Sequence, residues 1–596
     1  MKIGNWQLKI QNWNWCLLAL AAAFGAPQTA AGGALELVQE RWGFDGRVVP
    51  EQINLLSLEI ANRSPEPFQG AVRLFRADLL GGAHGAILVQ DCYLTPGASR
   101  WVQFFPYVGN ADEPWTLEWS GRLGREHAEL KPSALGPPAW AVLYDESDPL
   151  PPRASLPLFA DSLFPPTVSA TDGCYGLVLA HAPRWEAVRQ EAFLDWLRRG
   201  GQLHIVHGRS GRYPAFGEAL AALNNPAERF RVGAGLVVRH PVDPKQLSAE
   251  ALAKFGIVPP SIERNSNPRI YDFQEWLFER LASLAQPKHD WALIYLTILV
   301  YLALVGPVHY VYARKRRDYR PAVAFFLLTA LGCSLLLGFL GQRGQNEAAA
   351  VHSISYARQI DANHYDVAQW GSAFVTSGAV YDLTHDAPHR LYAAAREGVR
   401  DGEIACGKEG HFRVDIPLNS AQSFLFRGKL KGPTIQLRVV RWEERAGVLD
   451  LALEPAAGFP TDCAGLWAVR GTDYYPLTLR GGRIECASSS QGTLEAFVGD
   501  PMAPYMDTRY SDEGDLTPEK VMPPLASVLI NHSVGGVTTF LHILKYPGPD
   551  ADRLRVFILA RSPESFEVHG LRLGKRIGYA LYETDVFKPK TDAGAP

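Results

Sequence analysis

Five carboxylates lie in or near a segment that we expect to form an α/β domain, and acidic side chains of this kind can bind a metal ion. Three of them directly follow the apolar run at 140–144, which is typical of a buried strand. Ligands commonly bind beyond the carboxyl ends of parallel strands, so the group could line a cleft for a cation. The alternative, which we expect, is that these carboxylates are solvated charges on loops. The carboxylates are Asp145, Glu146, Asp148, Asp161 and Asp172.

A second possible chemistry is nucleophilic hydrolysis by Cys174, Asp145 and His181. It requires these side chains to converge in one cleft, because a base must reach its proton within hydrogen-bond distance. His204 and His207 are three residues apart, and odd spacing on a strand points side chains to opposite faces, so they are not expected to share a metal ion. The sequence therefore assigns no catalytic, cofactor-binding or metal-binding residue.

The segment 402–409, Gly-Glu-Ile-Ala-Cys-Gly-Lys-Glu, differs at one position from a phosphate-binding loop. Its eighth residue is Glu409, where Ser or Thr would ligate magnesium, and a carboxylate there repels phosphate. The surrounding sequence is also β-rich. We expect no nucleotide site and no cofactor.

Two apolar runs, 291–313 and 321–340, are each long enough to cross a hydrocarbon core of roughly 30 Å as a helix. Neither contains Asp, Glu, Lys or Arg, so we predict a transmembrane helical hairpin at 290–341. The turn at 314–320 carries five basic residues, and cytoplasmic loops are enriched in Lys and Arg. The turn is therefore expected in the cytoplasm, with both long flanking segments outside it.

Within the first apolar run, Gly306 and Pro307 are expected to kink the helix. His309 is an intramembrane ionisable residue, which is a functional candidate by default. It lies only about five residues from the basic turn, so we expect it near the interface in a structural role rather than in a proton relay.

The N-terminus has the features of a secretory signal peptide at 1–31. Lys2 and Lys9 precede an apolar run at 16–24, and small residues follow. Cleavage after Gly25 or after Ala31 fits this pattern. Without cleavage, the segment would be a third anchor with its N-terminus inside, and the rest of the topology would not change.

The formal net charge is −3 and no basic domain with interleaved aromatic residues is present, so no nucleic-acid partner is expected. Five of the seven cysteines fall on the expected oxidising side. Either Cys406, Cys463 and Cys486 contribute one disulfide, or the cysteines are buried free thiols. No C-x-x-C pair occurs, which argues against a zinc ribbon.

The rest of the chain divides by pattern into three regions. Short alternating runs at about ten-residue spacing predict an immunoglobulin-like β-sandwich at 35–135, followed by a linker. Strand and helix patterns alternate at 139–285, which predicts an α/β domain with a mainly parallel sheet. The region 345–590 is β-rich and could be one domain or two, with strands at 434–440, 448–453 and 554–560.

Two helices are expected in the α/β region. The helix at 184–199 places Val188, Phe193 and Trp196 on one face, together with Ala192 and Leu197, and Gly200 and Gly201 end it. The helix at 271–285 is amphipathic. It either packs on the α/β domain, which we favour, or rests at the membrane surface.

The stretch 192–203, Ala-Phe-Leu-Asp-Trp-Leu-Arg-Arg-Gly-Gly-Gln-Leu, resembles a segment of largely uncharacterised bacterial membrane proteins. The strand at 175–180 and the Gly306-Pro307 pair with Tyr310 fit the same resemblance. It implies an extracytoplasmic domain similar to class I glutamine amidotransferases, with an amidotransferase/flavodoxin-like fold. Active members carry a cysteine on a tight turn after a strand. Here Cys174 precedes its strand, so the resemblance implies a non-catalytic relative.

We therefore expect an integral protein of the bacterial inner membrane that is a non-catalytic scaffold or binding protein of the envelope. Its partners would be the lipid bilayer and other envelope proteins, reached through its extracytoplasmic domains. The alternatives are an envelope hydrolase or amidase that uses the α/β domain, and a solute sensor.

Overall fold

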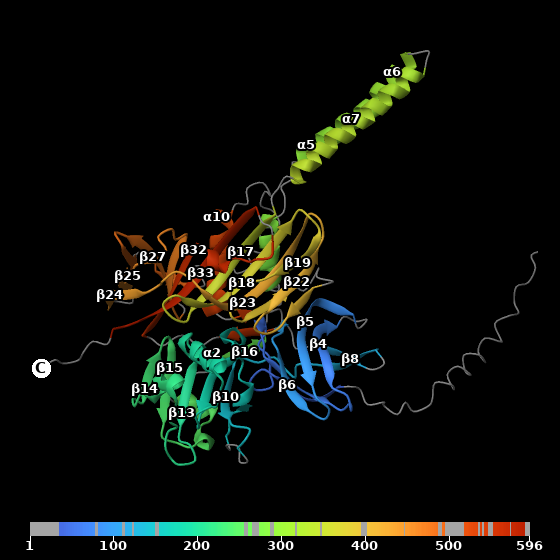
Figure 1. The fold of residues 1–596 in the computed structure, drawn as a ribbon. Coiled ribbons are helices and arrows are strands. Elements are labelled where there is room, and N and C mark those ends of the chain that lie inside the picture. Colours follow the sequence, from blue (N-terminus) through green and yellow to red (C-terminus); the bar gives the residue numbers. More distant parts are fainter. Residues whose placement is uncertain are drawn as a thin grey trace, which may run out of the picture.

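A computed structural model gives a mixed α/β architecture in which strands predominate (Figure 1). The predicted signal peptide at 1–31 and residues 316–318 of the basic turn lie outside the residues that it describes. The described residues are 35–77, 82–109, 114–121, 124–148, 154–254, 260–264, 273–285, 291–315, 319–345, 349–394, 402–445, 448–471, 473–486, 491–494, 518–534, 537–538, 542–545, 552–571 and 574–589.

The N-terminal region forms two β layers with an apolar core between them. Leu56 and Leu58 of the first layer share this core with Val72 and Leu74 of the second. The first layer has the order β1-β3-β6, with strands β1 (Leu35–Trp42), β3 (Leu56–Asn62) and β6 (Ser99–Phe104). The second contains β4 (Phe68–Ala77), β5 (Ala83–Leu94), β8 (Trp115–Gly121) and β9 (Gly124–Leu130).

The second layer continues into a distant part of the chain. β21 (Glu403–Ala405) pairs in parallel with β5, with Ile404 opposite Leu88. β22 (His411–Ile416) and β19 (Ala379–Leu383) then complete a seven-stranded sheet. The sequence predicts a sandwich at 35–135 that is separate from the β-rich region at 345–590. In the structure, this sheet contains strands from both regions. The pairing satisfies the backbone groups of β5, which would otherwise form an exposed edge.

The α/β region is a six-stranded sheet in the order β11-β10-β12-β13-β15-β14, parallel except for β14. Apart from the antiparallel β14, this is the flavodoxin-like strand order. The strands are β10 (Ala139–Tyr144), β11 (Leu158–Ala160), β12 (Cys174–Leu179), β13 (Gln202–Val206), β14 (Arg229–Val232) and β15 (Gly235–His240).

Helix α2 (Ala187–Arg198) covers one face of this sheet with Phe193 and Trp196, as the sequence predicts. Val188 is 40% exposed, contrary to expectation, because the buried residues of the helix begin only at Ala192. On the opposite face, α3 (Ala249–Lys254) contributes Leu252 to a smaller core.

Most of the described strands of the C-terminal region form one large sheet of twelve strands. Within it, β17 (Ala350–Gln359) pairs antiparallel with β18 (His364–Val375) and parallel with β33 (Lys575–Phe587). The predicted strands at 434–440, 448–453 and 554–560 correspond to β24, β25 and β32. The remaining strands are β20 (Arg390–Ala394), β23 (Ser420–Lys431), β24 (Leu437–Arg445), β25 (Val448–Pro455), β26 (Gly465–Arg470), β27 (Asp473–Arg480), β28 (Arg483–Cys486), β29 (Gly492–Thr493) and β32 (Arg553–Arg561).

Two helices cover part of one face of this sheet. Helix α4 (Phe273–Ala285) buries Trp276, Leu277 and Leu281 against Ile354 in a core that α10 (Pro518–Val534) completes. The expected helix at 271–285 therefore packs on protein, but on the C-terminal sheet instead of the α/β domain. The apolar face of α4 packs against strands that follow the hairpin in the sequence.

The hairpin extends away from the rest of the molecule (Figure 1). Its helices are α5 (Trp291–Ala303), a π-helical turn at Leu304–Val308, α6 (His309–Lys315) and α7 (Arg320–Gln345). Two stretches are long and apolar enough to cross a membrane, each with mean hydropathy 2.0 and 6% buried. The π-helical turn contains Pro307, which lacks the N–H that a regular helix needs. His309 stacks on Phe325 at 6.0 Å between ring centroids, within the hairpin itself.

The segments before and after the hairpin are bonded to each other. β16 (Ser261–Arg264) pairs with β31 (His542–Lys545), and β5 pairs with β21. Such pairing requires both segments to lie on one side of any membrane that the hairpin crosses.

Candidate functional site

A cavity of about 790 Å³ lies where three parts of the chain outside the hairpin meet. Glu51 and Tyr107 reach it from the N-terminal layers, Cys174 and Arg199 from the α/β domain, and Arg358 from the C-terminal sheet. Its volume falls in the range of about 300–1,000 Å³ that is typical of ligand pockets. Its lining includes residues of α2, β23 and β33, and Figure 1 labels these elements.

The lining of the cavity is rich in positive charge. Three carboxylates line it, Glu51, Asp172 and Glu583, and two more, Asp366 and Asp585, are ion-paired with lining arginines. The lining arginines outnumber these carboxylates by two. They are Arg199, Arg229, Arg231, Arg358, Arg427, Arg553 and Arg555. Clustered guanidinium groups bind carboxylates and phosphates in bidentate geometry.

Strand register places the central charges. Arg358 on β17 lies directly opposite Asp366 on β18. Arg427 on β23 lies opposite Ala368, two residues along from Asp366 on the same face of the sheet. The α/β domain supplies Arg199, which caps the C-terminal end of α2, and Asp172, which precedes β12.

These five residues form one buried ion-pair cluster, which we call the arginine–aspartate cluster. Asp172 contacts Arg427 at 2.6 Å and Arg358 at 2.8 Å. Asp366 contacts Arg358 at 2.8 Å, Arg427 at 2.9 Å and also Arg199. The Ser169 hydroxyl donates to Asp366 at 2.7 Å. The cluster thus joins the α/β domain to three neighbouring strands of the C-terminal sheet.

The aspartates of this cluster are held ionised. Their side chains are 4% and 0% exposed, and burial alone would raise their pKa. The surrounding guanidinium groups, led by Arg427, outweigh burial and hold the pKa of Asp172 and Asp366 below the usual range. Three arginines against two aspartates leave one positive charge in excess. Among the described residues, Nε of Arg427 has no hydrogen-bond partner, although its side chain is only 6% exposed.

Further ion pairs surround the same interface. Lys429 contacts Asp195 at 2.6 Å and Glu191 at 2.8 Å, which fixes α2 against β23. Arg553 forms a bidentate pair with Asp585 at 2.6 and 2.8 Å. Oppositely charged partners on both surfaces hold the walls of the cavity in position.

The Cys174 thiol and the His532 imidazole in the cavity are neutral. Burial raises the pKa of the Cys174 thiol well above its usual value, so it is a thiol rather than a thiolate. Burial lowers the pKa of His532 to about 4, so the imidazole is uncharged near neutral pH. These features suit a cavity that binds a ligand better than one that performs nucleophilic chemistry.

The structure does not bring the three candidate hydrolytic residues together. Cys174 begins β12, whose other end at Leu179 is about 16 Å away at 3.3 Å per residue, and His181 lies beyond that end. Asp145 lies at the same carboxyl edge as His181, and hydrogen bonds from Ser147 lower the pKa of Asp145. Only two of the three residues therefore share an edge of the sheet.

The carboxylates that the sequence grouped are divided between the two edges of the sheet. Asp161 hydrogen bonds His181 at 3.0 Å, and Asp148 pairs with Arg209 at 2.6 Å, both at the carboxyl edge. Asp172 lies at the opposite edge in the arginine–aspartate cluster. The hypothesis of a cation cleft is therefore wrong for Asp172, whose partners are three arginines. Within the described ranges, no group of three or more metal-ligating side chains is found.

The histidines also separate as their spacing predicts. Nδ1 of His204 lies 2.8 Å from Nε2 of His240, whereas His207 packs against Tyr213. All six cysteines of the described residues are free, so the alternative of a disulfide among Cys406, Cys463 and Cys486 is not realised.

The sequence patterns did not indicate Arg358, Asp366 and Arg427. One signal could have indicated Asp366 and Arg427, since each is a charged residue within a run of buried strand residues. In β18, Asp366 lies between Tyr365 and Val367, and both are fully buried. A charge at such a position requires a partner of opposite charge.

Comparisons with known proteins leave the family open. No family model and no curated protein matches the chain. Among solved structures, a Paenibacillus cycloisomaltooligosaccharide glucanotransferase is 8% identical with a TM-score of 0.15, covering 67% of this chain and 70% of that one. A β-glucuronidase of glycoside hydrolase family 2 is 8% identical with a TM-score of 0.13, covering 91% and 61%.

A third solved structure, the Pseudomonas fluorescens alkylpurine DNA glycosylase AlkC bound to DNA, is 14% identical with a TM-score of 0.13. The match covers 17% of this chain and spans 31% of the glycosylase. Scores this low identify neither a shared fold nor a shared function.

Proposed function

We propose that the chain is a membrane-anchored binding protein of the bacterial envelope, whose extramembrane parts together enclose a site for an anionic ligand. The arginine-rich cavity carries this proposal. It has the volume of a ligand site, an excess of guanidinium groups, and a neutral thiol and imidazole where a catalytic site would need activated ones. The solute-sensor alternative uses the same cavity, whereas the hydrolase alternative lacks convergent residues.

The proposal includes a location in the cytoplasmic membrane with residues 314–320 inside. The exposed apolar hairpin and the basic residues at its turn support it, and the strand pairing across the hairpin requires both lobes to share one side. These lobes would meet the solutes and proteins of the envelope, and the bilayer would cover the hairpin.

Reporter fusions test this topology. Alkaline phosphatase fused after Pro287 or Gln345 is expected to be active, because the enzyme folds only outside the cytoplasm. A reporter that fluoresces only in the cytoplasm should be active when inserted at Arg317. Phosphatase activity at Arg317, or fluorescence from either lobe, would reject the orientation.

Thermal unfolding of the purified full chain tests the ligand class. The probes are inorganic phosphate, citrate, glucose 6-phosphate and UDP-N-acetylglucosamine, each compared with sodium chloride of equal ionic strength. A probe that binds, at a concentration 100 times its Kd, is expected to stabilise the protein by about 2.7 kcal/mol. We expect at least one probe to raise Tm in this way.

Matched variants locate that effect. Arg231→Met keeps the apolar stem but removes a guanidinium from the cavity. The apparent affinity for the probe, obtained from the shift in Tm, should fall at least tenfold. Arg483→Met removes an exposed guanidinium from β28 and should leave the shift unchanged. Equal responses of the two variants, or no response of the native chain to any anion, would refute the proposed site.

A further inference from the structure

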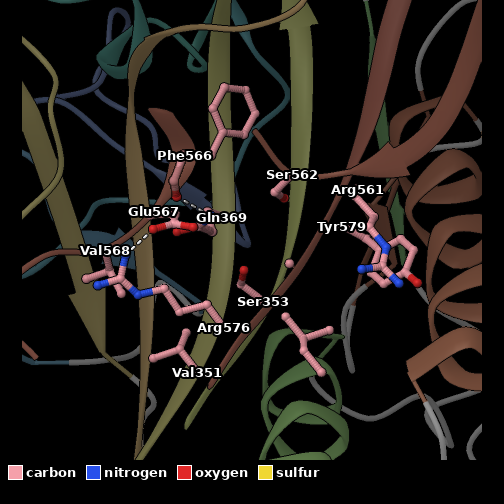
Figure 2. Close-up of a pocket in the computed structure, with 12 residues that line it drawn as sticks. Val351, Ser353, Gln369, Arg561, Ser562, Phe566, Glu567, Val568, Arg576 and Tyr579 are labelled. Atoms are coloured by element: carbon pink, nitrogen blue, oxygen red, sulfur yellow. Dashed lines mark hydrogen bonds and ion pairs between the residues drawn. The ribbon is translucent and has the colours of Figure 1, made fainter. Parts of the chain in front are cut away.

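A second, smaller cavity lies in the C-terminal sheet near the end from which the hairpin leaves. Its volume is about 190 Å³, and it opens where β32 ends at Arg561, beside the start of β33. An engineered cavity of about 150 Å³ holds benzene, so the volume suits a ligand slightly larger than that. Figure 2 shows the side chains that surround it.

Two serine hydroxyls converge on the floor of this cavity, which is Gly578. A Cβ atom added at Gly578 would lie 2.9 Å from Oγ of Ser353 and 3.0 Å from Oγ of Ser562. The space between the hydroxyls therefore exists only because residue 578 has no side chain. Figure 2 shows both serines between the Glu567–Arg576 pair and Arg561.

The hydroxyl of Ser562 is buried and has no hydrogen-bond partner in the described chain. Leaving a buried hydroxyl unsatisfied costs about 1–3 kcal/mol, so an external group is expected to satisfy it. The neighbouring Gln369 does not do so. Its amide already donates to Ser355 and to the Phe566 carbonyl, and its oxygen accepts from His385.

The charges of this cavity are balanced in pairs, unlike those of the larger one. Arg576 is ion-paired with Glu567, and Arg561 lies 3.8 Å from Glu519. A free anion would meet the Glu567 carboxylate, and a free cation would meet the two guanidinium groups. This balance favours a ligand without net charge.

The polar groups of this cavity differ in whether they donate or accept hydrogen bonds. Each serine hydroxyl can both donate and accept, Glu567 accepts and Arg576 donates. A ligand that meets all of them must carry several groups that are each donor and acceptor, as sugar hydroxyls are. Phe566, Val351 and Val568 supply apolar wall for the C–H face of such a ligand.

We infer that this cavity binds a neutral polyol of monosaccharide size, with the hydroxyls of Ser353 and Ser562 bonded to vicinal ligand hydroxyls. The site is separate from the arginine-rich cavity and does not depend on its ligand. A polyol here would contact β17, which begins at Ala350, close after the end of α7 at Gln345.

The test uses the full chain in a detergent that has no sugar head group. Glucose, N-acetylglucosamine and myo-inositol are each added at millimolar concentration, with methyl phosphate as the anionic probe because its methyl protons can be observed. Saturation-transfer NMR is expected to show contact with at least one polyol and no contact with methyl phosphate that depends on Ser562.

Two variants assign the contact to this cavity. Ser562→Ala removes the unpartnered hydroxyl and Gly578→Ala fills the floor, so each should weaken polyol binding at least tenfold. Ser562→Ala should keep or raise the Tm of the free protein, because a buried unsatisfied group is lost, and this separates lost binding from misfolding. Ser420→Ala, an exposed serine at the start of β23, is the matched control.

Three results would overturn the inference. In the first, the native chain transfers saturation to none of the polyols. In the second, the native chain and Ser562→Ala bind the polyol equally well. In the third, methyl phosphate gives a signal that Ser562→Ala abolishes. The last would replace the polyol by an anion.

Discussion

At pH 5 the free energy of unfolding is expected to be several kcal/mol lower than at pH 7.5. Four buried histidines cause this effect. Burial lowers the pKa of His204 and His385 to about 3, and the pKa of His352 and His532 to about 4. In the unfolded chain the same imidazoles have a pKa near 6.5.

The sign follows from proton binding. Below pH 6.5 the histidines of the unfolded chain bind protons that those of the folded chain do not bind, so acid favours unfolding. The stability that these neutral histidines contribute is therefore complete above pH 6.5 and is lost as the pH falls toward 4. At pH 5 the loss is about 2 kcal/mol for each histidine, from 1.36 kcal/mol per unit of pKa difference.

Hydrogen bonding explains why His385 resists protonation. Its Nε2 donates to Gln369 at 2.8 Å and its Nδ1 accepts from the Tyr392 hydroxyl at 2.9 Å. A proton on Nδ1 would turn this acceptor into a donor facing another donor. The hydroxyl of Tyr392 would then lose its acceptor inside a low-dielectric core.

Chemical denaturation at a series of pH values measures the effect. His352→Leu removes one titrating group, and Nδ1 of His352 has no partner to be lost, so the slope between pH 6 and 5 should fall by nearly one proton. His364→Asn changes an exposed histidine and is the matched control. A stability that stays constant from pH 7.5 to 5 would contradict the expectation.

Asp366→Asn is expected to destabilise the folded chain by about 3–5 kcal/mol. The substitution preserves the shape of the side chain but removes one of the two anions that three buried arginines share. Removing one partner of a buried ion pair leaves an uncompensated charge in a low-dielectric region, which is the cause of costs of this size. The lost charge-assisted bonds span the interface between the α/β domain and the C-terminal sheet.

Graded controls distinguish this interpretation from a general surface effect. Ser169→Ala removes only a hydroxyl that donates to Asp366 and should cost about 1 kcal/mol. Glu454→Gln breaks an exposed pair with Arg438, whose side chains are 77% and 42% exposed, and should cost at most about 1 kcal/mol. Denaturant titration of the three variants compares them. An Asp366→Asn variant within 1 kcal/mol of the native chain would show that the cluster does not hold the domains together.

Local pattern was sufficient to predict many of the elements. The predicted strand at 448–453 lies within β25, and the helix predicted at 184–199 is α2, three residues shorter at its start. The apolar length of the hairpin predicted two helices suited to crossing a membrane. These successes share one cause, because burial against a neighbouring layer imposes a period on the sequence that is visible within a dozen residues.

Pattern could not predict which partners these elements choose. The strand alternation of β5 is compatible with an edge position or with β21 beside it, more than 300 residues later in the chain. The amphipathic face of α4 is likewise compatible with any apolar surface. Periodicity indicates which face of an element is buried. The surface that covers this face is determined by the packing of the whole chain.

The sequence by itself determined the hairpin, the strand and helix types, and the absence of a local catalytic motif, because each depends on residues close together in the chain. Only the tertiary structure decided the candidate site, since Asp172 and Arg427 are 255 residues apart and meet through the register of distant strands. Ion pairing over such a separation leaves no spacing to recognise. It arises when two domains bury opposite charges that neither could bury alone.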